Sequence, residues 1–227
     1  MTRIKFCGIT NLEDAQLAVH AGAWAIGLIF WPGSPRRCEL DVAAEIAGAV
    51  KRRTEVVGVF FNAALDEVAA IADTVGLTML QLHGDEGPAY CSEAARRTGC
   101  KVIKAVRVRS GADVRALAAF HTDYHLLDSY TAGVPGGTGE TFAWEIARGD
   151  SIPARPPHTA RIPIILSGGL NPDNVADAIA AVRPFAVDVA SGVEADGDPA
   201  RKDPEKLEAF ALAVRAAQPA DLTTPAR

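Results

Sequence analysis

Cys7 and Asp128 are the two residues whose types and positions most suggest proton-transfer chemistry. Each closes a short apolar segment, Arg3–Cys7 for the thiol and Tyr124–Asp128 for the carboxyl group. A thiol acts as a base only where its surroundings favour the thiolate. A carboxyl group acts as an acid near neutral pH only in dry or anionic surroundings. Facing one cavity, the two side chains can serve as base and acid. The simpler alternatives are a small buried hydrophobe and a helix or turn cap.

Lys5 and Asp188 are placed to influence the Cys7 thiol. Strand alternation puts Lys5 on the same face as Cys7 and one layer lower, where its positive charge can favour the thiolate. Asp188 lies in the last predicted strand, which neighbours the first strand if the sheet closes into a barrel. We therefore predict a Lys5–Asp188 pair, with a purely structural ion pair on the barrel floor as the alternative.

Glycine turns follow the last two predicted strands. Gly168 and Gly169 follow one of them, and Ser191 and Gly192 follow the other. Backbone N–H groups in such a turn, with a helix N-terminus behind them, bind anions. Barrels often hold phosphate between the loops after strands seven and eight. We predict a phosphate site at these four residues; the alternative is that the glycines only make tight turns.

Arg36 and His83 are further polar candidates. Arg36 lies in a loop stiffened by Pro32 and Pro35, which favours a positioned guanidinium that can form two parallel bonds to a carboxylate. A solvent-exposed arginine is the simpler reading. His83 ends the fourth predicted strand, where we expect packing or a hydrogen bond at the rim rather than a base.

The elements that must position these residues are short apolar strands that alternate with amphipathic helices. Eight such units favour a parallel sheet. The chain has 227 residues, and a (β/α)8 barrel typically has about 250. The predicted fold class is therefore α/β, a single (β/α)8 TIM barrel over residues 1–217, with a doubly wound open sheet as the alternative. In such a barrel, Cys7, Asp128 and the two glycine turns share one rim.

The pattern also predicts the bounds of the elements. Asn11 and Asp41 are expected to cap the first two helices. Residues 149–160 read as an irregular proline-rich connection, and residues 218–227 as a flexible C-terminal tail. The expected strands are residues 3–7, 24–30, 55–60, 78–82, 101–106, 124–128, 162–166 and 186–190. The expected helices are residues 12–21, 41–50, 65–75, 88–98, 112–120, 142–147, 172–182 and 204–217.

Composition excludes several classes of function. The net charge is −5 and no long basic block is present, so nucleic acid is not an expected partner. No apolar run approaches the roughly 20 residues of a membrane span, and no signal peptide is apparent. The four cysteines lack CxxC or zinc spacing, which favours reduced thiols, a cytoplasmic protein and no metal site.

Taken together, the motifs resemble the phosphoribosylanthranilate isomerase family of tryptophan biosynthesis. Each motif is weak alone, but the ordered set is specific and runs from residue 5 to 194. The departures are Ser167, where alanine is expected, and the apparent insertion at 149–160. The matching segments are Lys5-Phe6-Cys7-Gly8-Ile9, Gly33-Ser34-Pro35-Arg36, Gln81-Leu82-His83-Gly84-Asp85-Glu86, Leu126-Leu127-Asp128-Ser129, Gly136-Gly137-Thr138-Gly139, Ser167-Gly168-Gly169-Leu170 and Asp188-Val189-Ala190-Ser191-Gly192-Val193-Glu194.

The resemblance implies an Amadori rearrangement of N-(5-phosphoribosyl)anthranilate, a phosphorylated aminoaldose, to 1-(o-carboxyphenylamino)-1-deoxyribulose 5-phosphate. Cys7 would be the general base, Asp128 the general acid and Arg36 the group that binds the substrate carboxylate. Because the protonated imine is the electron sink, no metal or organic cofactor is implied. The loop 131–139 would fold over the site, and either a monomer or a homodimer is compatible. Lys5, His83 and Asp188 would be supporting residues.

Two alternatives stay open on the residues alone. Another phosphosugar barrel, such as an epimerase or an indole-glycerol-phosphate synthase, would need a metal site or a catalytic set of lysine and glutamate on the rim. Besides Lys5 and Lys101, the strands offer only Lys104 for that role. A non-catalytic barrel that binds a phosphate ligand would leave Cys7 inert.

Overall fold

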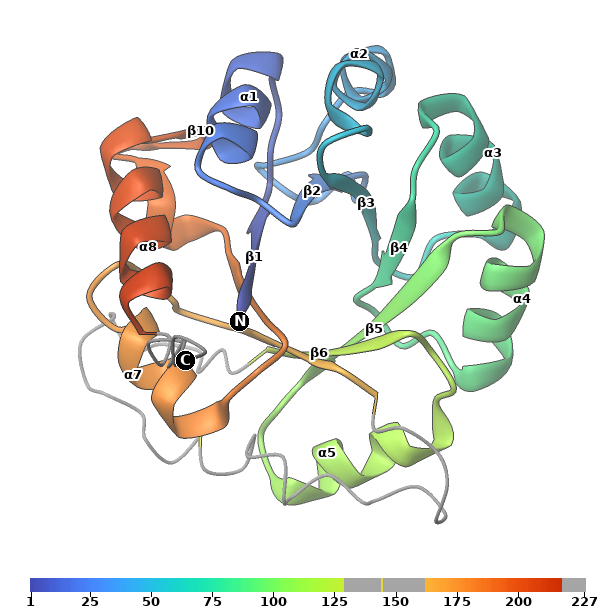
Figure 1. Cartoon of the computed structure of the whole chain (residues 1–227). Coiled ribbons are helices and arrows are strands. Elements are labelled where there is room, and N and C mark those ends of the chain that lie inside the picture. Colours follow the sequence, from blue (N-terminus) through green and yellow to red (C-terminus); the bar gives the residue numbers. More distant parts are fainter. Residues whose placement is uncertain (129–143, 145–161, 218–227) are drawn as a thin grey trace, which may run out of the picture.

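The computed structural model describes residues 1–128, 144 and 162–217, and its strands form a closed parallel barrel (Figure 1). Each strand pairs with the next, and β8 pairs back onto β1 with Asp188 opposite Lys5. The closure confirms the predicted TIM barrel and rules out the open sheet. The strands are β1 Arg3–Cys7, β2 Ala25–Ile29, β3 Glu55–Phe60, β4 Met79–Leu82, β5 Lys101–Arg107, β6 Tyr124–Asp128, β7 Ile164–Ser167 and β8 Ala186–Val189.

Helices follow the strands and surround the barrel (Figure 1). A short antiparallel pair, β9 and β10, which the sequence pattern did not predict, precedes the last helix. The bounds are α1 Leu12–His20, α2 Leu40–Val50, α3 Leu65–Val75, α4 Pro88–Thr98, α5 Gly111–Ala116, η1 Leu117–Ala119, α7 Val175–Val182, η3 Ser191–Val193, β9 Glu194–Ala195, β10 Asp198–Lys202 and α8 Pro204–Ala216.

Local hydrogen bonds explain where several helices begin. The Asn11 side chain accepts a bond from the Asp14 N–H at 2.8 Å and caps α1, as predicted. Asp41 does not cap α2, because the helix already begins at Leu40 and the Asp41 carboxylate accepts from the neighbouring Val42 N–H. Before α7, the Asn171 side chain accepts hydrogen bonds from the N–H groups of Asp173 and Asn174. That turn takes the place of the predicted first helical turn.

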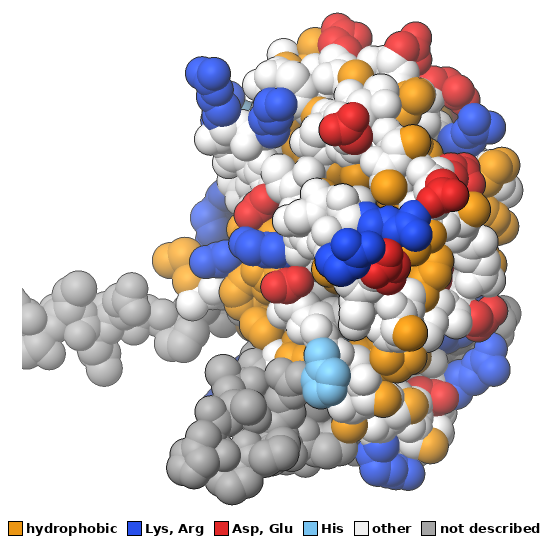
Figure 2. Space-filling model, turned by 90° about the vertical axis from the view of Figure 1, so that its right-hand side faces the viewer, with side chains coloured by type: hydrophobic (Ala, Val, Ile, Leu, Met, Phe, Trp, Pro, Cys, Tyr) orange, Lys and Arg blue, Asp and Glu red, His pale blue; other side chains and the backbone are white. Residues whose placement is uncertain are grey.

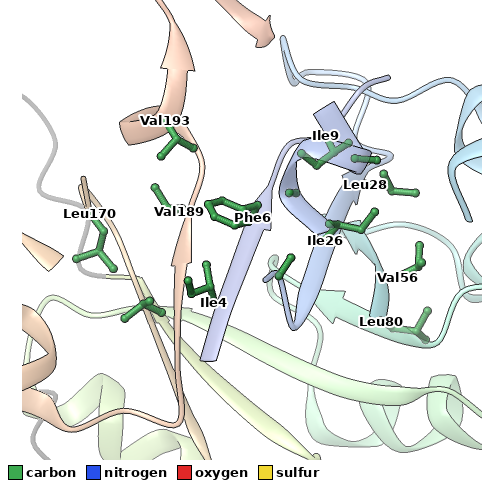
Figure 3. Packing of buried hydrophobic residues seen from close by; sticks show 14 of the residues in the cluster. Ile4, Phe6, Ile9, Ile26, Leu28, Val56, Leu80, Leu170, Val189 and Val193 are labelled. Carbon is green, nitrogen blue, oxygen red and sulfur yellow. The ribbon is translucent and has the colours of Figure 1, made fainter. Parts of the chain in front are cut away.

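Strand alternation creates two separate cores. The outward face packs against the helices: Phe6 points from β1 toward Val189 and Val193 (Figure 3), and its ring meets that of Phe210 edge-on at 6.0 Å between centroids. The barrel interior is filled mainly by small and aliphatic residues, which leaves the inward-facing polar residues of β1 enclosed. The interior cluster is Ala25, Val57, Met79, Ile103, Ala105, Leu126, Ile165 and Ala186.

The predicted bounds differ from the structure at some strand and helix ends. β7 begins at Ile164 and includes Ser167, and the fifth predicted helix divides into α5 and η1. The predicted loop 131–139, the connection 149–160 and the tail 218–227 lie outside the described residues, as does the helix 142–147 except for one residue.

The surface that carries α3 and α4 mixes acidic and basic side chains without a large patch of either sign (Figure 2). Some of these charges pair with each other: Arg97 of α4 bonds Glu93 on the same helix and Asp66 on α3. Such exposed pairs contribute little stability. Within the described ranges, none of the helices has the length and hydropathy required to span a membrane.

Candidate active site

Lys5 and Asp188 form the predicted ion pair in the barrel interior. The Lys5 Nζ donates to Asp188 Oδ1 at 2.8 Å, and the two side chains are only 0% and 5% exposed. The second carboxylate oxygen accepts from the Ser167 hydroxyl at 3.3 Å. Lys5 precedes Cys7 by two residues on β1, so the pair lies one layer below the thiol. The Asp188 carboxylate also links β8 to β7 through Ser167.

Burial dominates the ionisation of the Cys7 thiol. Burial has the largest effect and raises the pKa of Cys7, as does the negative charge of Asp188. The positive charges of Lys5 and Lys202 lower this pKa, and the net shift is upward. Burial would by itself lower the pKa of Lys5, but Asp188 and Cys7 outweigh it, and the lysine pKa is raised. Lys5 thus acts in the predicted direction, although the free protein holds Cys7 as a thiol beside a charged lysine.

Gly27 makes room for the thiol and the lysine together. It pairs with Cys7 in the sheet register. A Cβ atom at this position would lie 2.7 Å from Cys7 Sγ and 3.2 Å from Lys5 Nζ. Any larger residue would displace one of these two groups.

Asp128 on β6 is contacted by His83, which follows β4 two strands away, and Gln81 of β4 in turn contacts that histidine. His83 Nε2 lies 3.4 Å from Asp128 Oδ2, and the Gln81 side-chain nitrogen lies 2.9 Å from His83 Nδ1. When the Gln81 amide N–H donates to His83 Nδ1, that nitrogen is an acceptor and the ring proton is on Nε2. There it can be donated to the Asp128 carboxylate. His83 therefore makes the predicted rim hydrogen bond. Gln81 is buried and was missed, although a polar residue on the inward face of an apolar strand was a visible signal.

Cys7 and Asp128 close β1 and β6 at the same end of the barrel, with β7 and β8 between them. Asp128 is opposite Ser167 in the register of β6 and β7. Ser167 in turn bonds the carboxylate of the Lys5–Asp188 pair. Polar groups therefore follow the barrel wall from the thiol to the acid.

Arg36 is fixed by a residue that the sequence pattern did not single out. Its Nε and Nη2 donate to the two carboxylate oxygens of Glu194 at 2.5 and 2.9 Å. Its stem lies against the turn after β1, because a Cβ on Gly8 would meet Arg36 Cδ at 2.7 Å. Gly8 has φ +74°, a conformation that favours glycine. The arginine is thus half-buried beside the Cys7 turn.

The two glycine turns predicted to bind phosphate lie against each other. Gly168 and Gly169 have φ of 97° and 64°, which other residues rarely adopt. A Cβ on Gly192 would lie 2.0 Å from the Leu170 carbonyl oxygen, so the turn after β8 packs directly on the turn after β7. Ser191 opens η3 in that second turn. The glycines permit this close approach of two backbones, which bare N–H groups around one anion require.

Lys104 is fully engaged in a structural arrangement. Its Nζ donates to Glu86 Oε2 at 2.9 Å and to two backbone carbonyl oxygens, and both side chains are buried. The Glu86 oxygens also accept the N–H groups of Asn62 and Gly84. The Lys104 ammonium group thus has three hydrogen-bond acceptors, one for each of its protons, which argues against a catalytic role for this lysine.

The chain is similar to proteins of one family over most of its length. Residues 4–213 match the family model described as N-(5'phosphoribosyl)anthranilate (PRA) isomerase. An N-(5'-phosphoribosyl)anthranilate isomerase of Citrifermentans bemidjiense is 49% identical over 207 residues, 91% of this chain and 94% of that protein.

Solved structures agree with this similarity. A phosphoribosyl anthranilate isomerase from Thermotoga maritima superposes with a TM-score of 0.81 at 39% identity and covers 95% of this chain and 100% of its own. Another phosphoribosyl anthranilate isomerase, in complex with reduced 1-(o-carboxyphenylamino)-1-deoxyribulose 5-phosphate, gives 0.78 at 36% identity and the same coverage.

Proposed function

The chain belongs to the N-(5'-phosphoribosyl)anthranilate isomerase family, and from this premise we propose that it converts N-(5-phosphoribosyl)anthranilate to 1-(o-carboxyphenylamino)-1-deoxyribulose 5-phosphate. One observation carries the chemical assignment. A buried thiol above a Lys5–Asp188 pair and a histidine-bonded carboxyl group close strands at the same end of one barrel.

Asp128 is the general acid in this proposal. It gives a proton to the ring oxygen as the C1–O bond breaks, and the nitrogen lone pair forms the C1=N bond of an iminium ion. The His83 N–H at 3.4 Å holds the carboxyl group toward the site and stabilises the carboxylate that the transfer leaves behind.

Cys7 is the general base. As a thiolate it takes the proton from C2, and the C–H electrons form the C1=C2 bond while the iminium accepts charge. The enolamine then tautomerises to the ketone. Burial raises the pKa of Cys7 in the free protein. The positive iminium next to the sulfur favours loss of the thiol proton, with Lys5 and Lys202 acting in the same direction.

The two ends of the substrate are anchored by different groups. Arg36 binds the anthranilate carboxylate, and the turns at Gly168, Gly169, Ser191 and Gly192 bind the phosphate. Anchoring both ends holds C1 and C2 between thiol and carboxyl, which converts binding energy into orientation. The isomerase in the complex noted above binds a molecule that carries both groups.

A fluorescence assay that follows loss of the anthranilate conjugate without added metal tests the proposal. Cys7→Ser and Asp128→Ala should each lower turnover by about 10²–10⁴, the usual cost of a positioned base or acid. Cys91→Ser, which changes a buried thiol on α4, should leave turnover near wild type.

Both inactive variants should still bind the reduced product analogue. If both kept full turnover, the assigned roles would be wrong. If the wild-type chain bound the analogue without turning over substrate, a non-catalytic phosphate-binding barrel would be the better description.

A further inference from the structure

Arg36, Glu194 and Lys202 form one charged cluster between the loop after β2 and the β9–β10 pair. Glu194 receives both Arg36 bonds, and Lys202 Nζ lies 3.3 Å from Glu194 Oε1. The side chains are 25%, 10% and 0% exposed in that order. Burial would raise the pKa of Glu194, but Arg36 and Lys202 outweigh it and keep the carboxylate charged. The cluster is therefore a built feature rather than a chance surface pair.

The geometry of the Arg36–Glu194 contact determines which edge of the guanidinium is available to bind a second carboxylate. Glu194 takes Nε and one proton of Nη2, which form the side edge. The end edge, with one Nη1 proton and the second Nη2 proton, has no hydrogen-bond partner among the described residues. That edge has the same two-donor geometry for a second carboxylate.

Glu194 is close in sequence to the turn that is predicted to bind phosphate. It follows directly after η3, which holds Ser191 and Gly192. Lys202 Nζ also donates to the Ala190 carbonyl at 3.0 Å, so it binds both ends of this short segment. Gly192 packs on the turn after β7. The five-residue segment Ala190–Glu194 therefore connects the turns proposed to bind phosphate with the residue that holds Arg36.

We propose that Glu194 is a positioning residue that holds the Arg36 guanidinium at a fixed place relative to the Ser191–Gly192 turn, so that the site is matched to the length of a substrate with a carboxylate at one end and a phosphate at the other. The inference rests on the proposed function, which assigns Arg36 to the carboxylate. Lys202 supports the role by holding Glu194 and balancing its charge.

Two matched ligands separate this role from a merely structural one. The first is the reduced product analogue, reduced 1-(o-carboxyphenylamino)-1-deoxyribulose 5-phosphate. The second is the same molecule without the ring carboxyl group. Glu194→Gln should weaken the first by about 10- to 100-fold, as expected when charge-assisted bonds lose their geometry. It should leave binding of the second nearly unchanged, and that binding also reports that the variant is folded.

Further variants complete the design. Glu194→Asp, which keeps the charge but shortens the side chain, should fall between wild type and Glu194→Gln. Glu208→Gln removes the carboxylate of another glutamate–arginine pair, the one with Arg215 on α8, and should leave both affinities unchanged. In the assay, Glu194→Gln should raise KM and lower kcat together, because a displaced carboxylate also moves C2 away from the sulfur.

Equal weakening of both ligands by Glu194→Gln would overturn the inference and make Glu194 a structural residue. Arg36→Met tests the premise separately. If Arg36→Met also weakened both ligands equally, the assignment of Arg36 to the carboxylate would fail. If only Arg36→Met discriminated between the ligands, the proposed function would stand and the role of Glu194 would fall.

Discussion

The barrel contains two buried lysine–carboxylate pairs of nearly equal length that differ in their surroundings. Lys5–Asp188 lies inside the barrel at 2.8 Å, and Lys104–Glu86 lies on the outer side of the barrel wall at 2.9 Å. Each pair removes two charges from water, which is costly unless further hydrogen bonds satisfy them. The two pairs differ in the groups that complete them.

The outer pair is completed by backbone groups. Lys104 bonds two carbonyl oxygens, and the Glu86 oxygens accept two backbone N–H groups from the loops after β3 and β4. Those bonds hold the two loops together and leave the ammonium group no free direction. The pair functions as a clamp beside the strand that carries His83.

The inner pair is completed by side chains that can take part in proton transfer. Besides Asp188, Lys5 interacts with the Cys7 thiol, and the far oxygen of Asp188 accepts from Ser167. Charge in this pair therefore acts on a group that the proposed mechanism ionises. The outer pair also acts on a buried thiol, that of Cys91 on α4, but the inner pair acts on the thiol to which the proposed mechanism gives the role of base.

The two ion pairs should contribute equally to the free energy of unfolding. Lys5→Met and Lys104→Met each leave a buried carboxylate without its partner, and each should lower the free energy of unfolding by about 3–5 kcal/mol. Denaturant titration of both variants checks the value. A cost near zero for Lys104→Met would mean that the backbone bonds alone satisfy Glu86, and the outer pair would lose its role as a clamp.

Turnover should separate the two lysines. With both variants folded, Lys5→Met should lower kcat about 10- to 100-fold, because the thiolate loses a nearby positive charge, and Lys104→Met should lower it far less. The metal-free fluorescence assay at saturating substrate measures both. Similar losses in the two variants would remove the distinction between the pairs.

The pKa of Cys7 should also respond differently to the loss of Lys5 and of Lys104. Because the charge of Lys5 lowers the pKa of Cys7 against the effect of burial, its removal should raise that pKa further. The pH midpoint of Cys7 alkylation, read site by site with mass spectrometry, should move to higher pH in Lys5→Met and stay in place in Lys104→Met. A move to lower pH in Lys5→Met would contradict the assigned electrostatics.

The smallest predicted effects come from a pair of glycines. Gly27→Ala would place a Cβ against Cys7 Sγ and Lys5 Nζ and should lower turnover about tenfold by displacing the thiol. Gly48→Ala lies within α2, where a Cβ meets nothing within 4 Å, and should leave turnover unchanged. It should stabilise the protein by about 0.5–1 kcal/mol through helix propensity. Unchanged turnover in Gly27→Ala would show that the space beside the thiol is not required.

Much of the fold was predictable because its signals are local. Alternation along β1 placed Lys5 and Cys7 on the inward face, and eight strand–helix units predicted the closed barrel that brings Asp188 beside Lys5. The ends of elements were less predictable. The turn that delays α7 depends on the Asn171 side chain, which competes with a regular helical start.

The parts of the site that were missed depend on distant contacts. Glu194 reaches Arg36 across 158 positions of the chain, and its short strand shows no periodic pattern. Gln81 stands out in the sequence as a polar residue within an apolar strand. Its contact with His83, however, depends on both side chains pointing into the barrel. The net effect on Cys7 also needed the structure, because sequence spacing gives the charge of Lys5 but not the extent of burial.

The division of roles between Cys7 and Asp128 is tested most directly by a substrate that carries deuterium at C2. In Cys7→Ser, proton removal becomes the slowest step, so the isotope effect on kcat/KM should exceed that of the wild type. In Asp128→Asn, ring opening becomes the slowest step, and the isotope effect should fall toward unity. The opposite pattern, with a larger effect in Asp128→Asn, would contradict the assignment of base and acid.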